Sequence, residues 1–259
     1  MSIYKYKIIE SLSEGSFGLI YKGKHERTNE LVAIKTEPKD VKLNSLKHEA
    51  KIYQHLSGIK GIPSLKWFGY DSKSTFLVLP LYSESLKIRK ERLKQMPMED
   101  ICKIGKSILQ TLKEIHNQGM VHCDLKPANF LLNDDNIEQI YIIDFGFTRR
   151  FNPEDKKSNS SIGTPTYMSR RVHEKIEPKF FDDIESLLYV FIGLYFQKIP
   201  WDKPGSTREY MIMLKRTLML DTRGLPPFFK KFIEIINISE ENSFPQYEKL
   251  FKLFQSDQK

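Results

Sequence analysis

The spacing of the apolar residues changes near Pro80, and this change constrains the fold more than any other feature of the sequence. Before that point Tyr6 and Ile8 alternate with lysines, which is the period of a half-buried strand. Beyond it, the apolar residues of segment 101–115 recur every three or four positions, which predicts a long amphipathic helix. We therefore expect an α+β fold, with a strand-rich front joined to a helical back near residues 80–83.

Shorter segments follow the same division. The polar segment 155–161 is expected to be mobile. Further strands are expected at 19–21, 31–35, 76–79, 130–132 and 141–143. Further helices are expected at 46–56, at 187–196 and through the rest of the chain after segment 155–161, as far as residue 254.

The composition excludes several classes of protein. The chain has 41 lysines and arginines against 33 acidic residues, and the net charge of +8 favours acidic partners without choosing among them. Two cysteines, Cys102 and Cys123, cannot form a disulfide framework, so we expect a reducing location in the cytoplasm, the nucleus or both. No signal peptide or myristoylation motif is visible, and the longest apolar run is too short to cross a membrane. The basic residues are scattered, so nucleic-acid binding is not indicated.

Two motifs near the middle of the chain carry the chemistry. Segment 122–129 reads His-Cys-Asp-Leu-Lys-Pro-Ala-Asn, and segment 144–146 reads Asp-Phe-Gly. Together they resemble the catalytic loop and the metal-binding loop of Ser/Thr protein kinases. The resemblance implies a bilobal protein-kinase-like fold, with an N-lobe at 1–82 and a C-lobe at 83–259, and transfer of the γ-phosphoryl group of ATP to protein hydroxyls.

Each motif residue has a place in phosphoryl transfer. Asp124 can accept a hydrogen bond from the substrate hydroxyl and take its proton, and Lys126 can neutralise the migrating phosphoryl group. Asn129 and Asp144 offer oxygen ligands to Mg²⁺. By the same resemblance, Thr164 is expected to hydrogen-bond near Asp124 and Lys126.

The front of the chain contains a candidate nucleotide site. Segment 12–20 resembles the glycine-rich loop of kinases, although Ser13 stands where the first glycine usually lies. Lys35 resembles the strand lysine that holds the α- and β-phosphates, and Glu49 is its expected ion-pair partner. The gatekeeper and the hinge donor are expected at Leu79 and at Tyr82, since the intervening proline has no N–H to donate. The full set expected to bind nucleotide is Leu12, Ser13, Glu14, Gly15, Ser16, Phe17, Gly18, Ile20, Ala33, Lys35, Glu49, Leu79 and Tyr82.

The remaining motifs resemble the casein kinase I family over nearly the whole chain. The activation segment lacks the Ala-Pro-Glu that ends it in other kinases, and reads Gly-Thr-Pro-Thr-Tyr-Met-Ser at 163–169 instead. His-Glu-Ala-Lys-Ile-Tyr at 48–53, Asp-Asp-Ile-Glu-Ser-Leu at 182–187 and Ile-Pro-Trp at 199–201 also match the family pattern. The resemblance implies acidic or prephosphorylated protein substrates.

The chain departs from the family at several positions. Cys123 replaces the arginine that senses a phosphorylated activation loop in many kinases, so we expect activity without that phosphorylation, and the thiol raises the question of redox sensitivity. Phe180 and Phe181 replace an arginine pair, which weakens the expectation of primed substrates. The chain ends soon after its last helix, so we expect a minimal, tail-less kinase; a viral or microbial source would fit, and a viral kinase would act in the host cell or the virion. The basic residues expected to contact substrate are Arg149, Arg150, Arg170 and Arg171.

Two other functions use the same motifs. A pseudokinase scaffold would bind nucleotide without turnover, and Ser13 and Cys123 are its support. A small-molecule phosphotransferase of kinase-like fold would keep the aspartates, but such enzymes usually lack Lys126 and the segment at 163–169.

Overall fold

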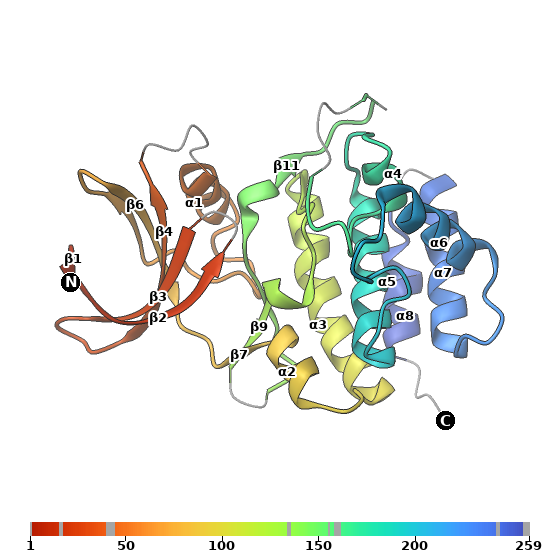
Figure 1. Ribbon diagram of the computed structural model, residues 1–259, viewed down its shortest axis with the longest axis horizontal. Helices are drawn as coiled ribbons and strands as arrows, with labels where there is room; N and C mark the ends of the chain where they lie inside the picture. The colour runs from red at the N-terminus through yellow and green to blue at the C-terminus, as the bar shows by residue number, and fades with distance from the viewer. Residues whose placement is uncertain are drawn as a thin grey trace.

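The computed structural model describes residues 2–15, 18–39, 45–133, 136–154, 156–157, 162–241 and 244–255. Ser16 and Phe17 of the expected glycine-rich loop lie outside these ranges, as does most of segment 155–161. Figure 1 shows a strand-rich part at the N-terminal end of the chain and a helical part in the remainder. The expected α+β, bilobal architecture is therefore confirmed.

An antiparallel sheet of six strands forms the described part of the front lobe, in the order β1-β2-β3-β4-β6-β5. Val32 and Ile34 of β4 and Phe76 and Val78 of β6 point to one face and form a small core there with Tyr6. The strands are β1 (Ser2–Ile3), β2 (Tyr6–Gly15), β3 (Gly18–His25), β4 (Leu31–Pro38), β5 (Trp67–Tyr70) and β6 (Ser74–Pro80).

Helix α1 (Ser45–His55) connects this sheet to the rest of the molecule. Leu46, Ala50 and Tyr53 recur at helical spacing, are buried, and join the large core of the chain rather than the small core of the sheet. The helix contacts β4, β6 and the 3₁₀ turn η2 (Phe145–Phe147) of the back lobe. The helix therefore contacts both lobes.

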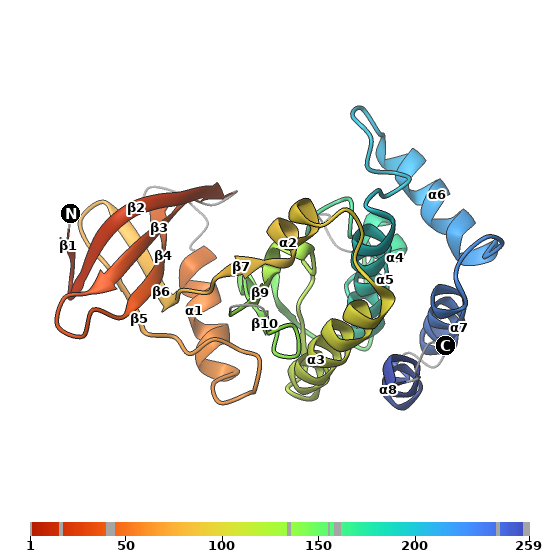
Figure 2. The ribbon, with the colours of Figure 1, turned by 90° about the horizontal axis from the view of Figure 1, so that it is seen from below.

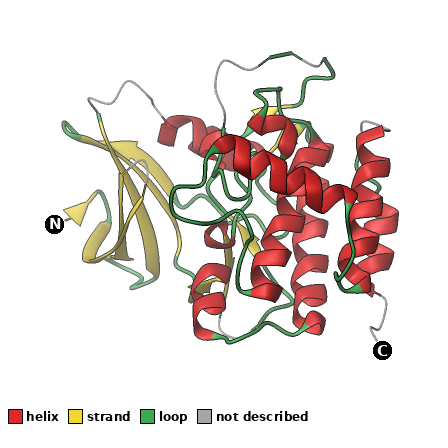
Figure 3. Ribbon diagram, turned by 45° about the vertical axis from the view of Figure 1, so that its right-hand side comes forward, coloured by secondary structure: helices red, strands yellow, loops and turns green. Residues whose placement is uncertain are grey.

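The back lobe is mainly helical, and Figure 3 shows the strands and the helices gathered at opposite sides of the molecule. Figure 2 shows α6 projecting away from the neighbouring helices α7 and α8. The helices are α2 (Leu86–Arg92), α3 (Met98–Asn117), α4 (Arg170–His173), α5 (Phe180–Phe196), α6 (Arg208–Leu220), α7 (Pro227–Glu241) and α8 (Tyr247–Gln255). The short strands and the second 3₁₀ turn are β7 (Glu84–Ser85), β8 (Met120–Val121), β9 (Phe130–Leu132), β10 (Tyr141–Ile142), β11 (Arg149–Arg150) and η1 (Pro127–Asn129).

Helix α5 is the centre of this lobe and is buried over almost its whole length. Its Phe191 meets Phe232 of α7 and Phe254 of α8 in a cluster of edge-on and tilted rings. A helix that is apolar on all sides belongs inside a protein or a membrane. No helix in the described ranges is long and apolar enough to cross a membrane.

Most of the expected elements are confirmed, with ends that differ by a few residues, but the helix expected directly after segment 155–161 is wrong: residues 162–169 form turns and irregular backbone. The long helix predicted at 101–115 is α3, and the strands predicted at 31–35 and 76–79 are the longer β4 and β6. The sequence analysis missed α2, because it is rich in basic residues and buries only Leu86. It also missed β5, all of whose residues are half-buried or exposed and therefore show no clear alternation.

We expect two matched leucines to differ sharply in their contribution to stability. Leu250 of α8 is fully buried, whereas Leu220 at the end of α6 is 88% exposed. Leu250→Ala should lower the free energy of unfolding by about 2–5 kcal/mol, because it leaves a cavity in the core. Leu220→Ala should change it by less than about 0.5 kcal/mol. Urea unfolding of both variants measures the difference, and equal effects would mean that α8 is not docked as described.

Candidate active site

Asp124 lies at the centre of the site, in the loop between β8 and η1, and is 3% exposed. Its Oδ1 accepts hydrogen bonds from the backbone N–H of Thr164 at 2.8 Å and from the hydroxyl of Thr164 at 2.7 Å. Its Oδ2 accepts one from Nζ of Lys126 at 2.6 Å. The carboxylate is therefore held in one orientation by groups on both of its oxygens.

Gly163 allows the activation segment to come this close to the catalytic loop. Its φ angle is +98°, and a Cβ atom would lie 2.4 Å from the carbonyl oxygen of Cys123. Only glycine combines that backbone angle with that approach. The next residue, Thr164, then also accepts a hydrogen bond from Nζ of Lys126 at 3.2 Å, as expected from the sequence.

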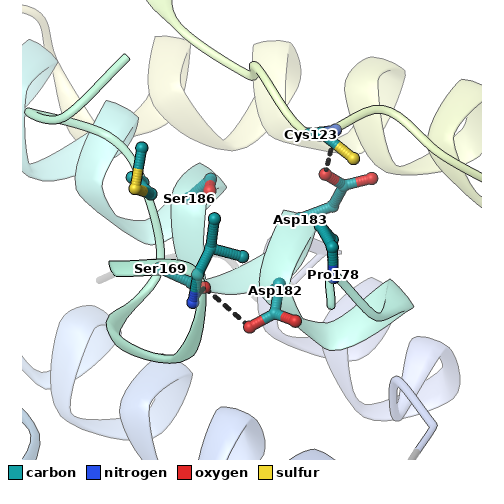
Figure 4. A pocket seen from close by; sticks show the side chains of 8 residues that line it. Cys123, Ser169, Pro178, Asp182, Asp183 and Ser186 are labelled. Atoms are coloured by element: carbon teal, nitrogen blue, oxygen red, sulfur yellow. Dashed lines mark hydrogen bonds between the residues drawn. The ribbon is translucent and has the colours of Figure 1, made fainter. Parts of the chain in front are cut away.

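The backbone of the catalytic loop is held by a buried carboxylate on α5. Asp183 accepts hydrogen bonds from the backbone N–H groups of His122 at 2.7 Å and of Cys123 at 2.9 Å. Figure 4 shows its carboxylate turned toward the backbone nitrogen of Cys123. Cys123 has a φ angle of +70°, which is rare for a residue with a side chain. Asp183 supplies the contacts that keep the loop in this strained conformation.

Two further side chains extend this network to the C-terminal helix. His116 of α3 lies 3.0 Å from Asp183 through Nε2, and 2.5 Å from the hydroxyl of Tyr247 on α8 through Nδ1. Because a carboxylate only accepts, Nε2 carries the proton and the hydroxyl of Tyr247 donates to Nδ1. Burial lowers the pKa of His116, in keeping with a neutral ring.

The surroundings of the Cys123 thiol favour its protonated form. It donates to the carbonyl oxygen of Val121 at 3.3 Å and lines a cavity of about 10 Å³, room for about one water molecule. Burial and the nearby charge of Asp183 raise the pKa of the thiol well above its ordinary value. Because the thiolate is the reactive form, these contacts disfavour a redox role.

A three-way ion pair joins the two lobes. Nζ of Lys35 on β4 lies 2.8 Å from Oε2 of Glu49 on α1 and 2.8 Å from Oδ1 of Asp144. All three side chains are mostly or fully buried. The ion pair expected between Lys35 and Glu49 is therefore present, and Asp144 lies beside the same ammonium group.

The ionisation of this trio follows from burial and charge. Burial raises the pKa of Glu49 to about 6, because loss of water outweighs the attraction of Lys35. Burial also disfavours the ammonium form of Lys35, but the two carboxylates outweigh it and raise its pKa. At Asp144 burial is outweighed by Lys35, and the pKa is lowered. All three groups are thus charged at neutral pH.

Helix α1 is also tied directly to the activation segment. Nε2 of His48 hydrogen-bonds the carbonyl oxygen of Thr148 at 2.8 Å, and the hydroxyl of Tyr53 accepts from the backbone N–H of Asp144 at 3.3 Å. The ring of Phe145 is fully buried and meets the ring of Tyr53 edge-on at 4.9 Å. These contacts hold α1 in the position that keeps Glu49 on Lys35.

Asn129 and Asp144 fit a divalent metal ion by the chemistry of their oxygens. The amide nitrogen of Asn129 donates to the backbone oxygen of Asp124 at 2.9 Å, so its carbonyl oxygen is left free of that contact. The backbone N–H of Ile143 donates to the backbone carbonyl oxygen of Asn129 at 3.0 Å, and this bond brings Asp144, the residue after Ile143, close to Asn129. One carboxylate and one amide oxygen are ligands that Mg²⁺ accepts when phosphates and water complete its shell.

Two residues expected to lie beside the adenine ring are neighbours on adjacent strands. Ala33 on β4 is directly opposite Leu79 on β6, and both are half-buried. The backbone N–H of Leu81 donates to the carbonyl oxygen of Leu31 at 3.4 Å, which occupies that donor. Tyr82 is the next residue of the connection with a backbone N–H.

The β2–β3 hairpin occupies the position of the glycine-rich loop. Ser13 pairs with Ile20, Glu14 with Leu19, and Gly15 with Gly18, while Leu12 is exposed on β2. A Cβ atom on Gly18 would lie 1.8 Å from the carbonyl oxygen of Thr36, so this glycine is required for contact with β4. The contact with β4 is therefore a structural reason for Gly18, in addition to its expected place in the nucleotide site.

Comparison with known proteins agrees with this geometry. The protein kinase domain family matches residues 6–252. Two Schizosaccharomyces pombe proteins, casein kinase I homolog 2 and casein kinase I homolog 1, are each 30% identical over 96% of the chain. A probable casein kinase I homolog of Encephalitozoon cuniculi is 35% identical over 79% of the chain and 67% of its own length. The chain is a protein kinase of the casein kinase I family. It spans 61% and 60% of the length of the two S. pombe relatives.

The basic residues of the kinase fall into two groups. Arg149 and Arg150 on β11 are exposed, and a terminal nitrogen of Arg149 lies 3.5 Å from the carboxylate of Glu177. Arg170 instead donates two hydrogen bonds to the buried carboxylate of Glu185, from Nε at 3.1 Å and from a terminal nitrogen at 3.2 Å. Arg171 covers the ring of Phe181 and lies 3.9 Å from Asp182. The structure therefore does not support substrate contacts by Arg170 and Arg171, which are engaged inside the fold.

The sequence analysis missed several residues that position the kinase site. Asp183 was noted only as part of a family motif, and His116, Tyr247 and Lys215 were not singled out. Their partners lie 60 or more positions away in the case of Asp183 and 131 positions away in the case of Tyr247. No local pattern signals such contacts, although an aspartate inside the apolar segment of α5 is a buried charge that must have partners.

Glu49 should give the kinase an acid limb in its pH profile. Its carboxylate must be ionised to hold Lys35, so activity should fall as the pH drops through about 6. This fall in activity is not caused by unfolding through Glu49. Because the pKa of Glu49 is higher in the folded than in the unfolded chain, its contribution to the free energy of unfolding is largest below the ordinary Glu pKa and is lost as the pH rises through about 6. Glu49→Gln should lower activity about 100-fold at pH 7.5 and abolish this limb. A profile from pH 5 to 8 measures both, and an acid limb that persists in the variant would assign it to another group.

Proposed function

We propose that the chain is an active Ser/Thr protein kinase that transfers the γ-phosphoryl group of ATP, with Mg²⁺, to hydroxyls of protein substrates. One observation carries the proposal. Asp124 is held between Lys126 and Thr164 while Lys35 pairs with both Glu49 and Asp144. A scaffold without catalysis would have no need of both arrangements at once.

Each side chain has a defined part in the proposed reaction. Asp124 orients the substrate hydroxyl and accepts its proton, and Lys126 neutralises charge on the transferring phosphoryl group. Lys35 orients the α- and β-phosphates. Asn129 and Asp144 would hold Mg²⁺, which neutralises phosphate charge and bridges their oxygens.

Ser/Thr specificity follows from Lys126 and Thr164. The lysine lies two residues after the aspartate, and its ammonium group reaches the threonine hydroxyl at 3.2 Å. A lysine at this place in the catalytic loop is typical of Ser/Thr kinases rather than tyrosine kinases, which supports an aliphatic hydroxyl as the acceptor. Arg149 and Arg150 are the exposed cations that would meet an acidic or phosphorylated segment of such a substrate.

The kinase is active without phosphorylation of its activation segment. Cys123 carries no charge to meet a phosphate, and its backbone is already fixed by Asp183. His48 and Tyr53 hold α1 to the residues around Asp144 through contacts that need no added phosphate. The active arrangement is thus the resting one.

Residues 1–82 and 83–259 are the two lobes of this single kinase domain, with the nucleotide between them. The sheet ends at Pro80 and the next strand begins at Glu84, so the boundary lies in the short connection between these residues. We place the protein in the cytoplasm, the nucleus or both, because its two cysteines are free.

Phosphate transfer to casein should test the proposal. Wild-type protein with Mg-ATP should label casein on serine and threonine, and Asp144→Asn should lower the rate about 100-fold or more, since it removes a charged metal ligand. Asp71→Asn on an exposed turn is the matched control and should keep the wild-type rate. Casein that has been dephosphorylated should be labelled more slowly if Arg149 and Arg150 bind a priming phosphate.

The outcomes of this experiment separate the alternatives. ATP binding without transfer to any protein, and no effect of Asp144→Asn, would favour the pseudokinase scaffold. Labelling on tyrosine would contradict the role given to Lys126 and Thr164.

Prior phosphorylation of the kinase should have no effect on its activity. Protein treated with a phosphatase, which is then removed, should phosphorylate casein within about twofold of the untreated rate, because the contacts of His48 and Tyr53 remain. The rate before and after treatment, with the phosphorylation state followed by mass spectrometry, measures this. A loss of tenfold or more on dephosphorylation would show that a phosphate supports the active state.

A further inference from the structure

A buried lysine that takes no part in the proposed chemistry lies beneath the activation segment. Lys215 of α6 has no exposed surface. Its Nζ lies 4.9 Å from the ring of Tyr189 and 5.4 Å from the ring of Trp201. Within the described residues no carboxylate lies at ion-pair distance from it. A lysine in such a place is costly to the fold, since an apolar side chain of the same length would avoid the loss of hydration.

The ammonium group of Lys215 contacts one backbone turn, at residues 165–168, and one side chain beside it. Nζ donates to the carbonyl oxygen of Pro165 at 2.8 Å and to that of Met168 at 2.7 Å. It also lies 2.9 Å from Nε2 of His173 on α4. We call residues 164–168 the platform turn, because they follow directly on Gly163 and begin with the threonine that contacts Asp124.

The platform turn is held from beneath at almost every carbonyl. The backbone N–H groups of Tyr167 and Met168 donate to the carbonyl oxygen of Thr164 at 2.9 and 3.0 Å. The indole N–H of Trp201 donates to the carbonyl oxygen of Thr166 at 2.8 Å. Lys215 holds two of the three carbonyls that remain, those of Pro165 and Met168, and Nε2 of His173 also lies 3.0 Å from the carbonyl oxygen of Pro165.

We propose that Lys215 is a positioning residue for the protein substrate, which fixes the platform turn so that Thr164 stays on Asp124 when a substrate chain lies across the turn. The proposal rests on the proposed kinase function. Lys215 cannot touch the substrate itself, because it is fully buried, so it acts through the backbone of the turn. Nucleotide binding, which uses Lys35 and the connection between the lobes, does not involve this contact.

The titration of Lys215 does not remove the contact. Burial lowers the pKa of Lys215 to about 7, although Glu185 on α5 opposes this shift. Burial and the charge of Lys215, with Arg208 contributing, lower the pKa of His173 to about 4, so its ring is neutral. The ammonium form donates to both carbonyls and to His173, and the amine form still has two N–H groups for the carbonyls. The other titratable group at this face is Tyr189, whose hydroxyl is bound to Glu185.

Steady-state kinetics with casein test the proposal. Lys215→Met keeps the length of the side chain and removes its donors, and it should raise KM for casein about tenfold or more while kcat falls less. The Kd for ATP, measured by calorimetry, should stay within about twofold of the wild-type value. Lys231→Met on the exposed face of α7 is the matched control and should leave all three quantities unchanged.

A second variant decides the case in which Lys215→Met does not fold. Lys215→Gln retains an amide group that can donate to the carbonyls, and its KM for casein should lie between those of wild type and Lys215→Met. A folded variant of either kind with wild-type KM for casein would overturn the proposal, as would an equal loss of ATP binding. If wild-type protein labels no substrate at all, the proposed function fails first, whereas normal wild-type activity with unaffected variants rejects the role of Lys215 alone.

Discussion

The buried carboxylate of Asp183 is the constraint on which the catalytic loop depends. It accepts the backbone N–H groups of His122 and Cys123, which would otherwise be buried donors without partners. Because it lies on α5, the most deeply buried helix, its position is set by the core of the back lobe rather than by the surface. The same carboxylate orders His116, and through it Tyr247 of the last helix. The reactive loop is thus connected by hydrogen bonds to packing on the far side of the lobe.

The ion pairs of Lys35 connect this back lobe to the sheet. The three charges are buried together. Removing one partner of a buried ion pair strongly destabilises a protein, because the other charge is left without a partner, although the complete pair adds little to the free energy of unfolding. Their value therefore lies in geometry, since Lys35 can satisfy Glu49 and Asp144 only when α1 lies against the activation segment. His48 and Tyr53 reinforce that position with neutral hydrogen bonds.

The sequence predicts the residues whose chemistry is fixed by the reaction, and much less about those that position them. The motifs at 122–129 and 144–146 could be recognised because their residue types and spacing are set by phosphoryl transfer and metal binding. Strands and helices with clear periodicity, such as β4 and α3, were also predictable, whereas the basic helix α2 was not. Arg170 was expected at the surface, but its partner Glu185 lies on the next long helix, and only the folded chain reveals that contact. Lys215 is the extreme case, since its partners are backbone carbonyls that have no sequence signature at all.

Aromatic side chains at the start of α5 pack against the activation segment. Phe180 stacks on Phe151 of that segment at 4.3 Å and on His116 at 4.6 Å, and Arg171 lies over Phe181. An arginine pair at these positions would require an anion to balance its charge, whereas stacked rings are satisfied by burial alone. Lys179 adds a direct bond to the carbonyl oxygen of Pro153 at 3.1 Å. Where the structure describes it, the segment is therefore fixed by apolar packing and by lysines bound to its carbonyls, while Arg149 and Arg150 stay exposed.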